Sequence, residues 1–202
     1  MKKLLTILLS LGAFMSTVYA QTSQGNLSFG GAIGYTSETE EDGGEDDKTS
    51  QFRFAPSVSY FIADNLAIGA DLSLVTQKRD DGFGGDDKYT EIAVGPLVRY
   101  YMFTSNDKFA FYGQAGFRFG SGKYEPDGLD ETKSSSFDLY ISPGFSYFFN
   151  EHWALDLQLQ GISYRTEDPN TDGDADDDKT KTFTFGVDSF NPSLGFRYFL
   201  GN

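Results

Sequence analysis

The sequence predicts an all-β protein, an eight-stranded antiparallel up-and-down transmembrane β-barrel. Three observations support this fold: apolar and polar residues alternate with a period of two, one short motif occurs four times, and short turns alternate with long acidic connections. Glycine (23 residues), phenylalanine (20) and tyrosine (12) are abundant, a composition typical of strands and turns.

The N-terminus has the three regions of a secretory signal peptide. Residues 2–3 are basic, residues 4–14 are apolar, and Val18-Tyr19-Ala20 provides small residues at positions −3 and −1 of a cleavage site. The apolar run is too short for a transmembrane helix, which needs about 20 residues. We therefore expect a cleaved signal peptide at 1–20 and a single barrel domain at 21–202.

Composition excludes several classes of protein. The chain has no cysteine, which excludes a lipoprotein anchor, a disulfide framework and a thiolate site. Its formal net charge is −14, and removal of the two leader lysines would make it −16 (−14 − 2). Such a surface repels nucleic acid, so we expect no nucleic-acid partner.

A repeated motif organises the rest of the chain. Each of its first three copies is followed by a short polar turn and a further alternating run. These three hairpins supply six strands. One strand before them, at 26–38, and one after them, at 190–200, bring the number to eight. Pairing of the first strand with the last removes both sheet edges. The motif is Pro-x-apolar-x-aromatic, beginning at Pro56, Pro96, Pro143 and Pro192.

Two features of the strands predict irregularities. Proline donates no ladder hydrogen bond, so the four equivalent prolines predict four bulges or kinks. In the last strand, Phe183 and Phe185 are apolar at odd positions, whereas Leu194 and Phe196 are apolar at even positions. This change of phase predicts a bulge near Asp188-Ser189.

The connections alternate between two kinds. The longer segments, approximately 39–48, 79–87, 122–133 and 166–180, contain most of the 30 acidic residues. Short turns at one rim and long loops at the other are typical of a barrel in the outer membrane of a Gram-negative bacterium. We therefore expect the short turns and both termini in the periplasm and the acidic loops outside the cell.

Side-chain volume predicts which face of the sheet points outward. One face of each strand carries bulky apolar groups, too many for the narrow interior of an eight-stranded barrel, and the other carries glycine, alanine and polar residues. The alternative is a soluble barrel with an aromatic core. Aromatic residues also flank the short turns, which predicts an interfacial girdle made of Tyr60-Phe61, Tyr100-Tyr101, Tyr147-Phe148-Phe149, Trp153 and Tyr198-Phe199.

The C-terminal strand carries a resemblance to a known family. The run 194–200, with Phe196, Tyr198 and Leu200 on one face, resembles the last strand of the small OmpA- and OmpX-like, porin-like outer-membrane barrels. The resemblance implies that the outer-membrane assembly machinery reads this strand as an insertion signal. Here Gly201-Asn202 follows the aromatic residues, where the family often ends on phenylalanine. Barrels of this family serve many purposes, so the fold does not name a function.

Charged residues on the predicted inner face balance one another. Buried charges persist when they are paired, so we interpret them as a network that fills the lumen. The alternative is a narrow polar path for ions or small solutes, for which eight strands leave little room. The predicted lumen network consists of Arg53, Arg99, Arg118, Arg197, Asp71, Glu91, Asp138 and Asp156.

One acidic loop resembles a calcium-binding sequence. Asp168, Asn170, Asp172 and Asp174 supply alternate oxygen ligands around a glycine, as in the pattern D-x-N-x-D-G, and predict a weak Ca²⁺ site. Lys179 occupies position twelve in place of the bidentate glutamate. The alternative is a solvated acidic loop that binds no metal.

Three functions from different classes remain open. The first is a monomeric structural or surface-interaction barrel that contacts outer-membrane lipid and lipopolysaccharide through its acidic loops and divalent cations. The second is a small passive pore. The third is an outer-membrane enzyme, which we do not expect, because His152 is the only histidine, lies in a predicted periplasmic turn and has no nucleophile beside it. We expect no other cofactor.

Overall fold

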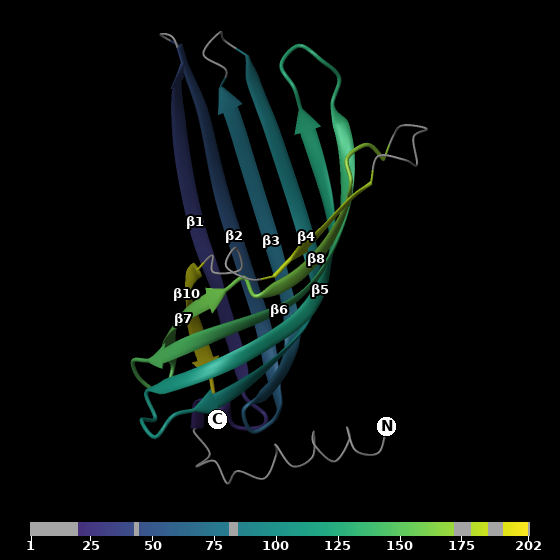
Figure 1. Ribbon diagram of the computed structural model, residues 1–202. Coiled ribbons are helices and arrows are strands. Elements are labelled where there is room, and N and C mark those ends of the chain that lie inside the picture. Colours follow the sequence, from purple (N-terminus) through teal and green to yellow (C-terminus); the bar gives the residue numbers. More distant parts are fainter. Residues whose placement is uncertain (1–19, 43–44, 81–84, 172–178, 186–191, 202) are drawn as a thin grey trace.

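The structure is a computed structural model that describes residues 20–42, 45–80, 85–171, 179–185 and 192–201 (Figure 1). Of the predicted signal peptide, only Ala20 lies among the described residues. No helix in these ranges is long and apolar enough to cross a membrane. The elements are the 3-10 turn η2 (Ala20–Thr22), β1 (Leu27–Asp42), β2 (Glu45–Ala63), β3 (Leu66–Asp80), β4 (Asp86–Phe103), β5 (Phe109–Glu125), β6 (Thr132–Phe148), β7 (Trp153–Leu159), β8 (Ile162–Asp168), β9 (Thr180–Thr184) and β10 (Pro192–Leu200).

The strands close into a ring. Strands β1 to β6 pair antiparallel in sequence order, and β6 then pairs with both β7 and β8 along its length. Because β8 pairs with β9 and β7 with β10, β7 and β8 are two halves of the seventh strand, and β9 and β10 are two halves of the eighth. Strand β10 pairs with β1, so the predicted fold class, a closed eight-stranded antiparallel barrel, is confirmed.

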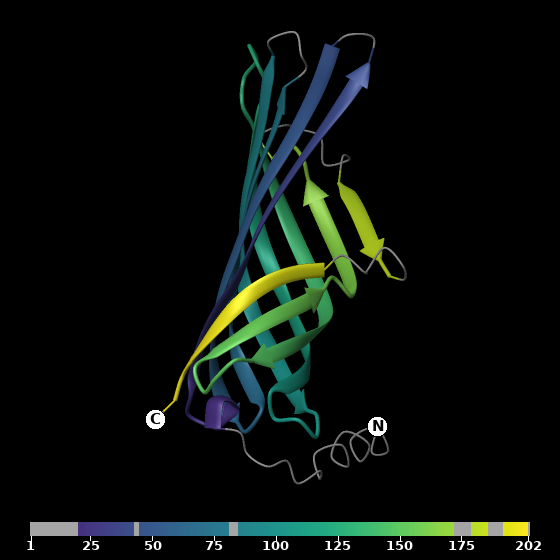
Figure 2. The ribbon, with the colours of Figure 1, turned by 90° about the vertical axis from the view of Figure 1, so that its left-hand side faces the viewer.

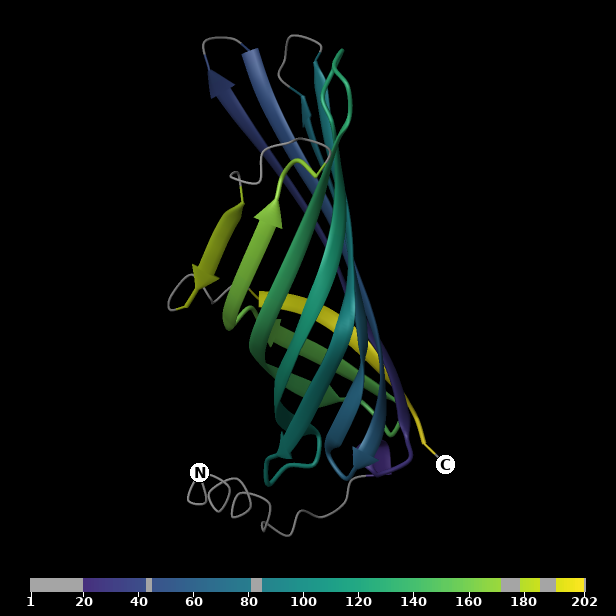
Figure 3. The same cartoon turned by 90° about the vertical axis from the view of Figure 1, so that its right-hand side faces the viewer.

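The barrel has two different rims. The short connections β2–β3, β4–β5 and β6–β7 lie at one end, with η2 and the end of β10, and we call this end the turn rim (Figures 1 and 2). The opposite end, where β1 meets β2 and β3 meets β4, is the loop rim. Figure 3 shows β8 and β9 side by side, ending below the tall hairpin of β1 and β2.

The alternation of side chains sets the two faces of the wall. In β4, burial changes at every position from Glu91 to Tyr100. The odd-numbered residues of this stretch are buried inside, whereas Ile92, Val94 and Tyr100 are 44–54% exposed on the outside. A wall that exposes bulky apolar side chains on all strands fits lipid rather than water. The predicted orientation of the faces is confirmed.

The predicted aromatic girdle is wrong for four of its ten residues, Phe61, Tyr101, Phe148 and Phe199. Tyr60, Tyr100 and Trp153 lie outside as expected, at 44–47% exposure. Their neighbours point into the barrel instead, because successive side chains of a strand must lie on opposite faces. These inward rings, together with Tyr112, form an aromatic layer that fills the barrel near the turn rim and consists of Phe61, Tyr101, Tyr112, Phe148 and Phe199, each at most 2% exposed.

The segment before β1 covers the aromatic layer at the turn rim. Thr22 is fully buried, and its Oγ1 donates a hydrogen bond of 2.6 Å to Oδ1 of Asn65 in the β2–β3 turn. The Asn65 amide donates back to the Thr22 carbonyl at 2.8 Å. Gly25 continues the contact through its amide, which donates to the Phe61 carbonyl at 2.9 Å. The N-terminal segment is therefore tied to the wall before the first strand begins.

A one-residue bulge separates β7 from β8. Gly144 pairs with Gln158 and Ile141 pairs with Ile162, so three steps along β6 correspond to four along β7 and β8. Gly161 lies at this point with φ of +70°, a conformation that glycine adopts without strain. The extra residue reverses the phase of the strand, so that even positions face inward before it and odd positions after it.

The eighth strand also changes phase, as predicted. Phe183 in β9 and Phe196 in β10 are both exposed outside, at 67% and 56%, although one position is odd and the other even. Position 158 pairs with 193, and position 163 pairs with 184. Between these two pairs the seventh strand advances by five residues and the eighth by nine, so the eighth strand has four more residues than the seventh in this interval. The predicted bulge position, Asp188-Ser189, lies outside the described residues.

The structure corrects the prediction of bulges or kinks for two of the four prolines, since neither Pro56 nor Pro96 lies at a bulge. At Pro56 and Pro96, pairing with one neighbouring strand stops for two residues and resumes in the same register. Pro143 faces the Gly161 bulge on the adjacent strand, and Pro192 is the first residue of β10. A missing N–H removes one ladder hydrogen bond, and this loss requires no extra residue.

Replacement of Gly161 by alanine should destabilise the barrel. An added Cβ would lie 2.0 Å from the Ile141 carbonyl oxygen, and the positive φ would be strained. We expect a loss of about 1–3 kcal/mol in the free energy of unfolding, measured with urea in lipid vesicles through the fluorescence of Trp153. Gly113→Ala is the control, because its Cβ would meet nothing within 4 Å. Equal unfolding midpoints for the two variants would contradict this account of the bulge.

Candidate functional site

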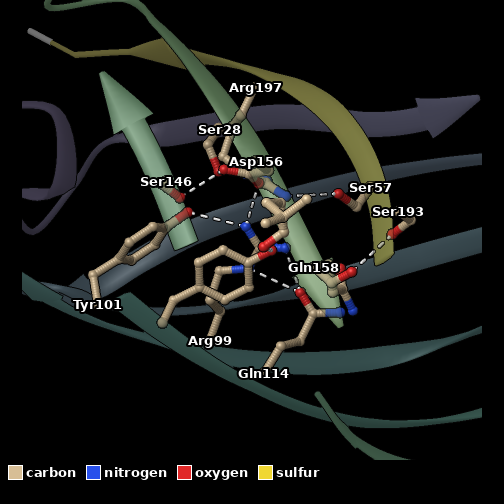
Figure 4. A network of polar contacts seen from close by, with 12 residues as sticks. Ser28, Ser57, Arg99, Tyr101, Gln114, Ser146, Asp156, Gln158, Ser193 and Arg197 are labelled. Atoms are coloured by element: carbon tan, nitrogen blue, oxygen red, sulfur yellow. Dashed lines mark hydrogen bonds and ion pairs between the residues drawn. The ribbon is translucent and has the colours of Figure 1, made fainter. Parts of the chain in front are cut away.

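The inner wall carries two polar clusters above the aromatic layer. The first, which we call the lower network, lies directly against that layer (Figure 4). The second, the upper network, lies nearer the loop rim. The lower network consists of Arg99, Gln114, Ser146, Asp156 and Arg197, and the upper network of Asp71, Glu91, Arg118, Asp138, Tyr140 and Arg165.

Asp156 is the centre of the lower network. Its Oδ2 accepts a hydrogen bond from Nη1 of Arg99 at 2.7 Å and another from Nε of Arg197 at 2.9 Å. Its Oδ1 accepts from the Ser146 hydroxyl at 2.6 Å. The side chains of Asp156 and the two arginines are at most 9% exposed. A buried carboxylate is stable when several donors surround it, and three donors do so here.

Arg99 connects this carboxylate to the opposite wall and to the aromatic layer. Its Nε and Nη2 donate to Oε1 of Gln114 at 2.8 and 2.6 Å, and its Nη1 also donates to the Tyr101 hydroxyl at 3.2 Å. The guanidinium carbon lies 4.1 Å from the centre of the Tyr112 ring, within range of a cation–π interaction. Polar and aromatic groups therefore fill the same cross-section of the barrel.

Arg197 joins the last strand to the first two. Its Nη1 and Nη2 lie 3.3 Å from the hydroxyls of Ser28 and Ser57, to which they donate. The guanidinium lies over Gly30, where an added Cβ would come within 2.6 Å of its carbon. A larger residue at position 30 would thus displace the arginine from Asp156.

The upper network is centred on Arg165. Its Nη2 donates to Glu91 Oε2 at 2.6 Å, its Nη1 to Asp138 at 3.2–3.3 Å, and its Nε to Glu167 at 3.1 Å. Glu91 Oε1 also accepts from the Ser136 hydroxyl at 2.9 Å. One arginine therefore links three carboxylates across the wall.

Arg118 is held more loosely than the other arginines of the lumen. It lies 3.9 Å from a carboxylate oxygen of Asp71 and of Asp138, too far for a direct hydrogen bond, and 4.7 Å from the centre of the Tyr140 ring. Its Nε and the Oδ1 of Asp71 have no hydrogen-bond partner among the described residues. The packing of polar groups is therefore less complete here than around Asp156.

The sequence pointed to most of these residues but not to all. Every predicted lumen residue except Arg53 takes part in an ion pair inside the barrel. Arg53 lies nearer the loop rim with its side chain exposed, and no ion pair joins it to a described residue. Arg165 was missed because the Gly161 bulge reverses the phase of its strand. An isolated glycine within a strand pattern is the signal that could have revealed it.

The predicted calcium ligands are only partly described. Asp172 and Asp174 lie outside the described residues. Asp168 Oδ1 accepts a hydrogen bond of 3.3 Å from the Asn170 amide, and its Oδ2 lies 3.9 Å from Nζ of Lys179. In the part of the chain that the structure describes, no three acidic, histidine or cysteine side chains could hold a metal together. The calcium site stays a prediction.

The remaining singled-out residues lie near the turn rim. Nδ1 of His152 lies 3.2 Å from the Phe199 carbonyl oxygen, and its ring packs 5.8 Å from that of Tyr198. Phe196 and Leu200 are 50–56% exposed on the outside of β10, on the same face as Tyr198. The predicted assembly residues thus share one outward face of the strand that closes the ring.

Comparisons with known proteins identify one family and several similar solved structures. The family model for the outer membrane protein beta-barrel domain matches residues 6–189. The sequence matches none of the curated proteins at a significant level. Similar solved structures include OprG from Pseudomonas aeruginosa (15% identity, 91% of this chain and 99% of that chain covered, TM-score 0.47). They also include Ail, the attachment invasion locus protein of Yersinia pestis (20%, 88% and 99%, TM-score 0.42), and Neisserial surface protein A (16%, 86% and 95%, TM-score 0.44).

The family match covers most of the chain, and it falls on a closed ring of eight antiparallel strands with an apolar outer face. Both findings indicate the outer membrane of Gram-negative bacteria as the location of the protein. The chain belongs to the outer membrane protein beta-barrel domain family.

Proposed function

We propose that this protein is a structural and surface-interaction barrel of the outer membrane whose lumen passes no solutes. In this proposal the turn rim and both termini face the periplasm, and the acidic loops face outside the cell. The observation that carries the proposal is the filled cross-section of the barrel. At the level of Arg99 and Asp156, paired charges and the rings of Tyr101 and Tyr112 occupy the lumen together.

The burial of the plug residues supports a closed lumen. Phe61 and Phe199 have no exposed surface, and Tyr101 has 1%. Below them, η2 is hydrogen-bonded to the β2–β3 turn. A pore for ions needs a continuous polar path, and a layer of packed aromatic rings interrupts it.

The lumen is less closed near the loop rim. A cavity of about 200 Å³ there is lined by Gln77, Arg79, Asp87, Tyr89 and Tyr124. The inner wall of β1 is also exposed at this level. The lumen therefore resembles a vestibule that opens at the loop rim and ends at the plug, which supports surface interaction rather than passage through the barrel.

The loop rim carries the acidic surface. In the hairpin of β1 and β2, the acidic residues Glu40 and Asp47 lie directly opposite each other. Like charges at directly opposite positions destabilise a strand pair, and divalent cations would relieve this repulsion. This register supports the proposal that cations bridge the acidic loops to phosphates of lipopolysaccharide.

We propose no catalytic role for the protein. His152 lies at the turn rim, bonded to backbone, whereas the charged groups of the lumen are engaged with one another. The serine hydroxyls that lie beside lumen carboxylates, Ser146 at Asp156 and Ser136 at Glu91, contact carboxylates that are already paired with arginine.

Single-channel recording in planar bilayers tests the closed lumen. We expect no discrete conductance steps from the wild-type barrel, because the aromatic layer and the lower network block the path. A variant that removes the plug, Arg99→Ser with Tyr101→Ala and Phe199→Ala, should conduct. The control Tyr100→Ala changes an outward ring of the same strand and should stay silent. Discrete steps from the wild type would favour the passive pore instead.

Assembly should depend on the outward face of β10. If the assembly machinery reads this face, Phe196→Asn with Leu200→Asn should lower the amount of folded protein in the outer membrane several-fold. The matched control is Phe29→Asn with Tyr60→Asn, which removes two outward aromatic residues from β1 and β2. Fractionated membranes and unboiled gels, on which a folded barrel migrates compactly, give the measurement. Equal losses in both variants would show that general apolar surface is needed, not this strand.

A further inference from the structure

Basic residues are sorted by type between the two faces of the wall. Every arginine of the chain lies at an inward position, as Arg99, Arg165 and Arg197 illustrate. The lysines of the strands lie at outward positions, in phase with exposed apolar residues of the same strand. Lys88, for example, shares its face with Ile92 and Val94. These outward lysines are Lys48, Lys78, Lys88, Lys123, Lys133 and Lys181.

Five of these lysines form a continuous row on five consecutive strands, β2 to β6. Lys78 pairs directly with Lys88, and Lys123 pairs directly with Lys133. Lys48 pairs with position 80, two residues from Lys78, and Lys123 pairs with position 90, two residues from Lys88. Neighbouring members are therefore opposite or diagonal to each other, within reach of a common ligand. We call Lys48, Lys78, Lys88, Lys123 and Lys133 the lysine belt.

The lysine belt belongs to a layered pattern that all five strands share. From the middle of the barrel towards the loop rim, the outward positions carry an apolar residue, then a hydroxyl residue, then the lysine. In β4 these are Ile92, Thr90 and Lys88, and in β5 they are Phe119, Ser121 and Lys123. The other strands repeat the order with Phe52, Ser50 and Lys48, with Leu74, Thr76 and Lys78, and with Phe137, Ser135 and Lys133.

Carboxylates begin one position further out than the lysine belt. Glu125 lies 3.3 Å from Nζ of Lys88 and 3.1 Å from that of Lys123, which also pairs with Glu131 at 2.5 Å. These pairs contact Lys88 and Lys123 from the loop side. On the membrane side the neighbours are hydroxyl and apolar groups, so the ammonium groups lie where the apolar surface of the wall ends.

A hollow in the outer surface lies within the lysine belt. Its volume is about 450 Å³, and its lining combines three lysines with hydroxyl and apolar groups and with the carboxylate of Glu125. The lining residues include Lys88, Thr90, Ile92, Ser121, Lys123 and Lys133. The same three layers thus meet in one depression that faces the surrounding membrane.

We propose that the lysine belt is a binding site for the phosphate groups of membrane lipids, with one headgroup seated in this hollow. Lipid phosphates lie just beyond the hydrocarbon, at the depth where the lysines follow the apolar and hydroxyl layers. Directly opposed lysines repel each other, and a phosphate between them removes that repulsion and accepts hydrogen bonds from both. The flexible stem of lysine can pack on apolar surface while its ammonium reaches the phosphate. This proposal goes beyond the closed lumen and does not depend on it.

Binding of a phosphorylated glycolipid to the purified barrel in neutral detergent tests the proposal. The probes are bisphosphorylated lipid A and the same lipid without its phosphates, and native mass spectrometry counts the bound molecules. We expect Lys78→Gln, Lys88→Gln, Lys123→Gln and Lys133→Gln together to weaken binding of the phosphorylated lipid by about tenfold or more. The dephosphorylated lipid should bind weakly to wild type and variant alike.

Control variants distinguish loss of this site from a general loss of positive charge and from a failure to fold. The four lysines replaced by arginine should keep binding within about twofold, because the charge is retained. Lys108→Gln with Lys179→Gln removes lysines outside the belt and should leave binding unchanged. Compact migration on unboiled gels checks that each variant is folded. Equal binding of the two lipids to wild type, or unchanged binding to the glutamine variant, would overturn the proposal, whatever conductance the barrel shows.

Discussion

The buried charge of Asp156 is the constraint on which the closed barrel depends. Because the side chain of Asp156 is only 9% exposed, its carboxylate needs compensation from inside the wall. Arg99 of β4 and Arg197 of β10 supply it, and Ser146 of β6 completes it. The same contacts therefore tie the last strand to the opposite wall and support the six-residue pairing of β10 with β1 that closes the ring.

This single network explains several local features of the sequence. Gly30 leaves space for the Arg197 guanidinium, and Gly144 leaves space for the Tyr112 ring, which an added Cβ would approach within 2.1 Å. Arginine suits these inner positions because its planar group donates in several directions and is weakly hydrated. Lysine, a strongly hydrated point charge, lies outside, where it can reach a headgroup. The two basic residue types thus mark the two environments of the wall.

Much of the fold could be predicted from alternation alone. The period of two identified the lipid-facing positions, and the four copies of the motif that begins at Pro56 gave the number of hairpins. The volume of the apolar side chains excluded a barrel with its apolar face inside. Both Tyr100 and Tyr101 were predicted from the sequence to lie at the membrane interface. Because successive side chains alternate, Tyr100 lies on the outer face and Tyr101 points into the lumen. Local periodicity also missed Arg165. One extra residue at Gly161 changes the inward positions of this strand from even to odd, and the pattern before the bulge does not reveal that change.

Most of the lumen charges could be assigned to the inner face from the sequence, but their pairing could not. Sequence gives the face of each residue, whereas the partner across the lumen depends on the stagger of the ring. Arg99 and Asp156 are 57 positions apart and meet only because β4 and β7 face each other across the closed barrel. Arg53 shares their face but lies too near the loop rim to join them.

A double-mutant cycle on Arg99 and Asp156 tests the central claim most directly. Urea unfolding in lipid vesicles would give the free energies for Arg99→Met, Asp156→Asn and the combined variant. A dry, paired network predicts a loss of about 3–5 kcal/mol for Asp156→Asn, because this change leaves Arg99 and Arg197 buried without their carboxylate. Arg99→Met should cost less, because Arg197 still pairs with Asp156, and the double variant should lose less than the sum. Small and additive losses would show a hydrated lumen and contradict the account.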